Sequence, residues 1–146
     1  MVCVGAALSY VLDRREKAVK ELIRVAKKGS NLIFQVQSKY GMIHNKIRKG
    51  LVEQALDIHN NKMFIDGQGV KSHLYTVQEI TELLIYNGCD ILEIASTPVF
   101  THTANQEIYS KNLEKLKILQ TLEYAYCTKP ELLGLGHHIL VVAKKL

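Results

Sequence analysis

The sequence predicts an α/β fold, a class in which the strands of a largely parallel sheet alternate with helices. A short β-branched run at 1–4, an amphipathic helical pattern at 14–28 and an alternating strand pattern at 31–37 follow one another. Strand, helix and strand in this order make a βαβ unit, whose parallel strands are joined by a right-handed crossover. The length of 146 residues and the 47% hydrophobic content fit a single domain over 1–146.

The first strand, at 1–4, is expected to be buried and to end in a tight loop. Three small residues follow it directly: Gly5, Ala6 and Ala7. Side chains of this size let a ligand or another backbone approach closely. Asp13 is placed to cap the amino end of the helix at 14–28, and Gly29 is placed to cap its carboxyl end.

The middle of the chain predicts an interrupted helix and then a loop. Apolar residues recur at helical spacing over 40–59, although Gly41 and Gly50 weaken the pattern. The next stretch, 60–73, is polar and rich in glycine, and therefore predicts a mobile loop.

A capping box marks the start of the next helix. Thr76 is followed three residues later by Glu79, and the helix that they open should end at Gly88. A strand at 90–96 comes next, and Pro98 closes it.

The last third of the chain predicts a surface helix and a central strand. The pattern at 107–127 places leucines on one side and lysines on the other. The uninterrupted apolar run at 138–143 is typical of a strand with neighbours on both sides.

One segment carries a family resemblance. The run LIRVAKKGSNLIF at 22–34 resembles the turn before the fifth strand of class I S-adenosylmethionine-dependent methyltransferases, with Lys28 and Ser30 in place of a usual proline and glycine. The whole chain is similar to the second half of this family. The resemblance implies a truncated Rossmann-like methyltransferase sheet that lacks the first three strands, and therefore a partial methyltransferase domain. It assigns the family's fourth to seventh strands to 1–4, 31–37, 90–96 and 138–143, with the seventh antiparallel between the fifth and sixth.

Within the family, the tail is most similar to the tRNA wobble-uridine oxyacetate methyltransferases and their quinone-type relatives. The matching pieces are YGMIHNKIRKG, PVFTH and LEYAYCTKPELLGLGHHI. This resemblance implies S-adenosyl-L-methionine as cofactor. It also implies an oxygen or carboxylate acceptor, carried by a small molecule or by tRNA.

The resemblance also implies the site residues. Gly5 and Ala6 would flank the cofactor, although a tight turn explains Gly5 equally well. Three residues after the first strand would line the substrate pocket: Leu8, Ser9 and Tyr10. Three more follow the strand at 31–37: Tyr40, His44 and Asn45. The latter could orient an acceptor by hydrogen bonding, or only cap their helix. His102 is a weaker candidate of the same type.

The histidines and cysteines predict no metal site. His137 and His138 are adjacent, so in a strand they should point to opposite faces. No H-E-x-x-H or C-x-x-C motif is present. The three cysteines are far apart and fit a reducing cytoplasm.

The net charge and the lengths of the apolar runs indicate whether the chain could bind RNA or span a membrane. The formal net charge is +5, and the basic run of Lys46, Arg48 and Lys49 could meet RNA phosphates or form a solvated helix face. No apolar run approaches the roughly 20 residues that span a membrane.

The sequence also predicts that part of the cofactor site is missing from this chain. No G-x-G-x-x-G turn follows a strand, so a second polypeptide or an upstream segment should supply the turn that grips the cofactor. We expect the chain alone to be inactive and to self-associate through the exposed edge of its first strand. The alternatives are a catalytically inactive methyltransferase-like remnant that acts as a partner subunit, and a decayed reading frame.

Overall fold

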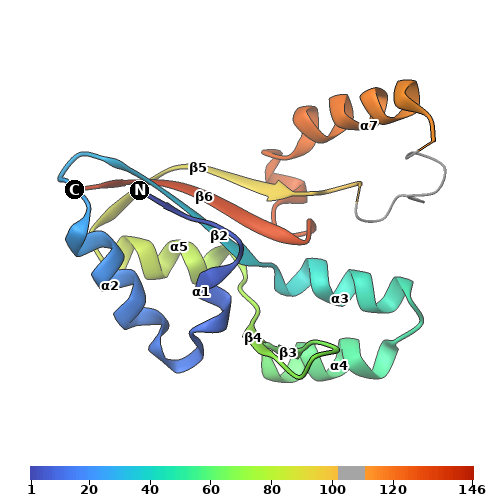
Figure 1. Ribbon diagram of the computed structural model, residues 1–146, viewed down its shortest axis with the longest axis horizontal. Coiled ribbons are helices and arrows are strands. Elements are labelled where there is room, and N and C mark those ends of the chain that lie inside the picture. Colours follow the sequence, from blue (N-terminus) through green and yellow to red (C-terminus); the bar gives the residue numbers. More distant parts are fainter. Residues whose placement is uncertain (102–110) are drawn as a thin grey trace.

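A mixed sheet forms the centre of the computed structural model, which describes residues 1–101 and 111–146 (Figure 1). The four strands lie in the order β1-β2-β6-β5. Their bounds are Val2–Cys3 for β1, Asn31–Gln37 for β2, His138–Lys145 for β6 and Cys89–Thr97 for β5. β1 and β2 are parallel, and β6 is antiparallel to both of its neighbours. The α/β class, the parallel pair and the central last strand are therefore confirmed.

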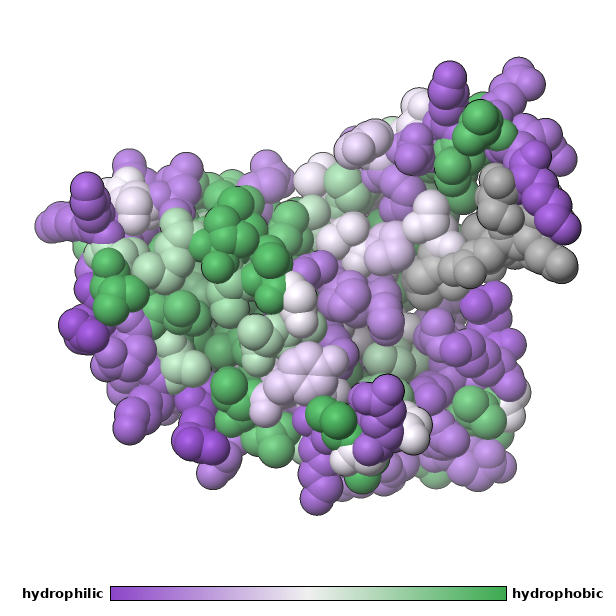
Figure 2. Space-filling view, viewed as in Figure 1, coloured by the Kyte–Doolittle hydropathy of each residue, from purple (hydrophilic) through white to green (hydrophobic). Residues whose placement is uncertain are grey.

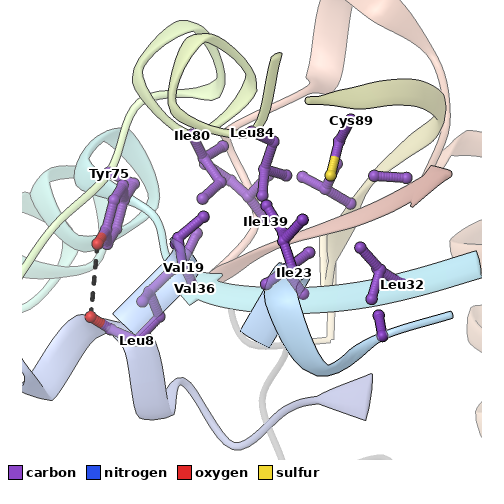
Figure 3. Packing of buried hydrophobic residues seen from close by; sticks show 14 residues of the cluster. Leu8, Val19, Ile23, Leu32, Val36, Tyr75, Ile80, Leu84, Cys89 and Ile139 are labelled. Atoms are coloured by element: carbon purple, nitrogen blue, oxygen red, sulfur yellow. Dashed lines mark hydrogen bonds between the residues drawn. The ribbon is translucent and has the colours of Figure 1, made fainter. Parts of the chain in front are cut away.

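Helices cover one face of this sheet. The short helix α1 (Ala7–Tyr10), a 3₁₀ turn at Leu12–Arg14, α2 (Arg15–Val25) and α5 (Val77–Tyr86) all lie on the same side (Figure 1). The core between them and the sheet is apolar (Figure 3). Its sheet residues are Leu32, Phe34, Val36, Ile139, Val141 and Ala143, each at most 1% exposed. Burying a side chain of this kind stabilises the fold by roughly 1.5–3 kcal/mol.

Both ends of α2 differ from the prediction. Asp13 lies inside the 3₁₀ turn, so Arg14 takes the capping position without a side-chain hydrogen bond. The helix ends at Val25 and not at residue 28, because Ala26 is already extended. Gly29 instead turns the chain toward the sheet with a φ of 76°, and its N–H donates to the carbonyl of Lys145 at 2.9 Å.

The segment from Lys39 to His73 forms a second unit, here called the lobe. The predicted interrupted helix is divided into α3 (Lys39–Arg48) and α4 (Val52–Asn61), because Gly50 adopts a φ of 72° where α3 ends. The predicted loop is wrong. It contains a hairpin of β3 (Met63–Ile65) and β4 (Lys71–His73).

One side chain organises the turn of this hairpin. Asp66 Oδ1 accepts hydrogen bonds from the backbone N–H groups of Gln68 and Val70 at 2.8 and 2.9 Å. A carboxylate that satisfies turn amides in this way holds a glycine-rich segment in one conformation. The polar composition therefore reflects a tight turn, while the flanking strands supply apolar residues to the lobe.

The capping box is half formed. Thr76 Oγ1 accepts from the N–H of Glu79 at 3.1 Å, and Gly88 follows the helix with a φ of 82°, so both predicted ends of α5 are confirmed. The Glu79 carboxylate does not return to Thr76. It instead binds His73 Nε2 at 2.6 Å and Lys62 Nζ at 3.5 Å, which ties the lobe to α5.

The burial predicted for the first strand is wrong. Val2 is 60% exposed and Val4 is 50% exposed, because β1 has a neighbour on one side only. Among the described strands, β1 lies at the edge of the sheet.

The predicted surface helix is α7 (Leu113–Tyr126), on the other side of the sheet from α2 and α5 (Figure 1). The part of the prediction at 107–110 lies outside the described residues. Glu123 anchors α7, since its carboxylate accepts from the backbone N–H groups of Val99, Phe100 and Thr101 at 2.5–2.8 Å. The apolar side of α7 stays largely open, with Leu113 74% exposed.

Two further findings concern the helices and the cysteines. Within the described ranges, no helix is both long and apolar enough to cross a membrane. Cys3, Cys89 and Cys127 all carry free thiols.

Candidate functional site

The candidate site lies at the edge of the sheet where the parallel strands β1 and β2 end. Ligands of open α/β sheets bind beyond this edge. Gly5 ends β1 with a φ of 71°, and its N–H donates to Gln35 Oε1 at 2.8 Å. A Cβ added to Gly5 would meet no atom within 4 Å, so space is open beside it. Ala6 is also left-handed, with a φ of 55°, but is only 2% exposed.

The residues of α1 divide between core and surface. Leu8 is 2% exposed and packs in the core, where its carbonyl accepts from Tyr75 Oη at 3.4 Å (Figure 3). Burial raises the pKa of Tyr75, so this hydroxyl remains protonated and able to donate. Ser9 is fully buried, whereas Tyr10 is 43% exposed. Tyr10 is therefore the one of the three whose side chain is substantially open to solvent.

Gln37, at the carboxyl end of β2, joins these residues and was not predicted as a site residue. Its backbone N–H donates to Ser9 Oγ at 3.0 Å, and its Nε2 donates to Tyr10 Oη at 3.1 Å. The side chain is 8% exposed, and its Oε1 has no hydrogen-bond partner among the described residues. An amide with one unpartnered buried atom can accept a ligand group there. A polar residue at the end of an apolar strand was the signal that could have identified it.

The second predicted group lies at the start of α3. Ser38 caps this helix by accepting from the N–H of Gly41 at 3.2 Å, and it donates to the carbonyl of Gly134. Tyr40 is 51% exposed and lies beside the loop at Gly134. His44 is one helical turn further on the same side of α3, and Asn45 follows it.

The loop at Gly134 and Gly136 closes this edge of the sheet. Both N–H groups donate to the buried Ser96 Oγ, at 2.9 and 3.0 Å. A Cβ at Gly136 would approach Thr97 N within 2.7 Å, and a Cβ at Gly41 would overlap the Gly136 carbonyl. These glycines permit close backbone packing of α3 against the ends of β5 and β6.

The two adjacent histidines lie at the same edge. Their ring centroids are 4.7 Å apart, so the expectation that they point to opposite faces is wrong. The reason is that β6 begins at His138, which leaves His137 outside the regular strand. Burial lowers the pKa of both rings, and the charges of His138 and Lys49 lower the pKa of His137 further. Neutral rings can accept as well as donate hydrogen bonds.

Two other predictions concern histidines and basic residues. His102 lies outside the described residues. Within the ranges that the structure describes, no group of three or more His, Cys, Asp or Glu side chains could hold a metal ion. Lys46 Nζ lies 4.5 Å from the ring centroid of Phe64, so part of the predicted basic run packs within the lobe.

The fold is similar to solved structures of S-adenosylmethionine-dependent methyltransferases. The chain matches one from Methanosarcina mazei at 20% identity and a TM-score of 0.56, covering 100% of this chain and 57% of that one. It matches another from Listeria monocytogenes at 16% identity and a TM-score of 0.55, covering 99% of this chain and 59% of that one. A third, from Clostridium acetobutylicum, matches at 14% identity and a TM-score of 0.53, covering 99% of this chain and 56% of that one.

These matches show the fold. The chain has the Rossmann-like class I methyltransferase fold and spans less than three fifths of the length of these structures. No family model and no curated protein sequence matches the chain.

Proposed function

We propose that this chain forms the acceptor side of an S-adenosylmethionine-dependent methyltransferase. The observation that supports this most strongly is the placement of Tyr10, Gln37 and His138 at the ligand-binding edge of a methyltransferase sheet. Gln37 and His138 are register partners on neighbouring strands, and Gln37 also holds Tyr10. Three groups that form hydrogen bonds therefore lie around one end of β2.

The cofactor in this proposal is S-adenosyl-L-methionine, which supplies a methyl group already activated on a sulfonium. The open space beside Gly5 fits a ligand that passes the end of β1, and Ala6 follows it in the same turn. The protein's own task is then to bind and orient the acceptor. Gln37 and Tyr10 would hold the acceptor by hydrogen bonds, and Tyr40, His44 and Asn45 would border it from α3.

The acceptor in this proposal is an oxygen or carboxylate, carried by a small molecule or by tRNA. A carboxylate acceptor has no proton to lose, whereas a hydroxyl acceptor needs a base, and a neutral His138 could take that proton. Arg48 and Lys49 could meet tRNA phosphates. The free thiols of Cys3, Cys89 and Cys127 support a reducing compartment such as the cytoplasm.

Activity in this proposal requires the remaining strands of the fold. They come from chain outside these residues or from a second polypeptide, and they would pair with the free edge of β1. Self-association through that edge competes with this pairing.

Transfer of labelled methyl groups tests the proposal. The chain, completed by the remaining strands, is incubated with labelled cofactor and either fractionated tRNA or a small-molecule extract. We expect label in one fraction and its loss in Gly5→Trp, which fills the open space, while Gly69→Trp on the lobe turn, where φ is 81° and space is also open, serves as the control with the same backbone strain. Cofactor binding without transfer to either fraction would favour an inactive partner subunit, and equal turnover in Gly5→Trp would contradict the site.

A further inference from the structure

The joint between α3 and α4 exposes four aliphatic side chains. Ile47 lies in the last turn of α3, while Leu51 caps α4 and Val52 begins it. The N–H of Gly50 donates to the Ile47 carbonyl at 2.9 Å, so the chain turns within a few residues. Leu56 follows Val52 by four residues and therefore lies on the same side of α4. These residues, here called the lobe tip, are Ile47, Leu51, Val52 and Leu56, and each is between 37% and 61% exposed.

The lobe tip is distinct from the apolar residues that pack inside the lobe. Ala55 and Ile58 of α4 are buried, and Ile58 belongs to the small apolar cluster of the lobe. Val52 and Leu56 lie on another side of the same helix and remain open. A helix that packs against its protein along one side needs only one apolar side. Packing among the described residues therefore does not account for the second apolar side of α4.

Positive charge surrounds the lobe tip. Arg48 and Lys49, where α3 ends, are both exposed. The lobe, residues 39–73, has six basic and three acidic residues, so it carries +3 of the formal net charge of +5. The acidic residues of α4, Glu53 and Asp57, each follow an aliphatic residue by one position and so lie about 100° from it around the helix. The tip thus combines open aliphatic side chains with neighbouring cations.

The lobe tip lies at one end of the molecule. Figure 1 shows the joint of α3 and α4 at the end away from both termini of the chain. Figure 2 shows apolar side chains set among hydrophilic ones over this part of the molecule. The tip could therefore meet an extended surface while the sheet and its helices stay outside that surface.

We propose that the lobe tip binds the surface of an anionic lipid bilayer, with its aliphatic side chains below the headgroups and Arg48 and Lys49 among the lipid phosphates. Helices that combine aliphatic and basic residues bind at this depth, and their affinity grows with buried apolar area and with anionic lipid. Binding of this kind needs no membrane-spanning helix. The inference is independent of the proposed methyl transfer.

Two other kinds of partner fit the lobe tip less well. RNA phosphates would pair with the basic residues but would leave the four aliphatic side chains in water. Protein interfaces are enriched in aromatic side chains and depleted of lysine, whereas the tip has Lys49 beside it and no aromatic residue. A bilayer of anionic lipid uses both the charge and the aliphatic side chains.

A single introduced tryptophan tests the proposal, because the chain has none of its own. Leu56→Trp places the reporter on the tip. Ile85→Trp, on α5, is the control, since Ile85 is 58% exposed and Leu56 is 61% exposed. With vesicles of phosphatidylcholine and phosphatidylglycerol, we expect the tryptophan emission to shift to shorter wavelength in Leu56→Trp and not in Ile85→Trp. Pure phosphatidylcholine vesicles or high salt should reduce the shift.

Co-sedimentation with the same mixed vesicles tests the two contributions separately. Val52→Glu should lower the partition coefficient about tenfold, because it places a charge among the acyl chains. Lys49→Glu should lower it for the mixed vesicles only. Ile85→Glu, on α5, should leave it unchanged. Circular dichroism checks folding, and if Val52→Glu does not fold, the two tryptophan variants decide alone.

Three outcomes would overturn the inference. Emission of Leu56→Trp that does not change with the mixed vesicles, or changes equally in Ile85→Trp, means that the tip does not enter the bilayer. Emission that is already at short wavelength without vesicles means that another copy of the chain covers the tip. Binding of tRNA by the unaltered chain, without binding of vesicles, assigns the basic residues to RNA. Vesicle binding without methyl transfer by the completed enzyme keeps this inference and contradicts the proposed function.

Discussion

The sheet core and the lobe are held together by different forces. Fourteen buried residues form the apolar cluster between the sheet and its helices. The lobe has a small apolar cluster in which Met42 and Ile58 pack with Leu74, the residue that directly follows the lobe. Polar contacts supplement it, including Lys39 Nζ to the His59 carbonyl at 2.9 Å and the pair of His73 with Glu79 at 2.6 Å. The core should therefore respond to lost volume, and the lobe to lost hydrogen bonds and charge.

The largest effect is expected in the core. Phe34→Ala should lower the free energy of unfolding by about 3–5 kcal/mol, since it leaves a cavity in the middle of the sheet. Denaturant titration measures this loss. Phe64→Ala in the lobe, where the ring is partly exposed, should lower the free energy of unfolding by less than Phe34→Ala. Equal losses would contradict the difference between the two regions.

The next effect concerns the junction of lobe and sheet. Gly41→Ala should destabilise the protein by about 1–3 kcal/mol, because the new methyl group would overlap the Gly136 carbonyl. Gly67→Ala, where a Cβ meets no atom within 4 Å, is the matched control. Thermal unfolding of both variants would reveal the difference, and a neutral Gly41→Ala would show that α3 does not pack closely on the strand ends.

A loss of similar size is expected at the anchor of α7. Glu123→Ala removes one acceptor from three backbone N–H groups and should cost about 1–3 kcal/mol. Hydrogen exchange should accelerate at Val99, Phe100 and Thr101 while the core amides stay protected. Glu114→Ala, on the exposed first turn of α7, should leave these three rates unchanged.

The smallest effect is a pH dependence in the lobe. Burial alone would raise the pKa of Glu79, but the hydrogen bond from His73 and the charges of His73, Lys62 and Arg15 lower it below the usual glutamate value. The carboxylate therefore stabilises the fold fully above that usual value, and its contribution is lost as the pH falls through the lowered pKa. Glu79→Gln should cost about 1 kcal/mol near neutral pH and less in acid. A loss that is constant with pH would exclude the ion pair as its cause.

Apolar periodicity was sufficient to predict the two central strands, whereas their order in the sheet was predicted from the family resemblance. The strands at 31–37 and 138–143 alternate or run apolar because packing on the sheet selects such residues, and the structure places both centrally. The cap of Thr76 was predictable because it depends on residues three apart in the chain.

The lobe and the site depend on contacts that no local pattern encodes. Gly50 divides the predicted helix, and Asp66 closes a turn within a segment that resembles a loop in composition. Gln37 forms hydrogen bonds with Tyr10 and Ser9, which lie 27 and 28 positions earlier in the chain. Such distant partners become visible only once the sheet register is known.

Calorimetric titration of S-adenosylmethionine tests the central claim, that this chain is the acceptor side of a methyltransferase whose cofactor is held largely by other strands. The titration is made into the purified chain alone and into the chain with the unmatched part of the Methanosarcina mazei methyltransferase. The account predicts no measurable binding to the chain alone and binding to the mixture. Tight binding of the cofactor by the monomeric chain on its own would contradict it.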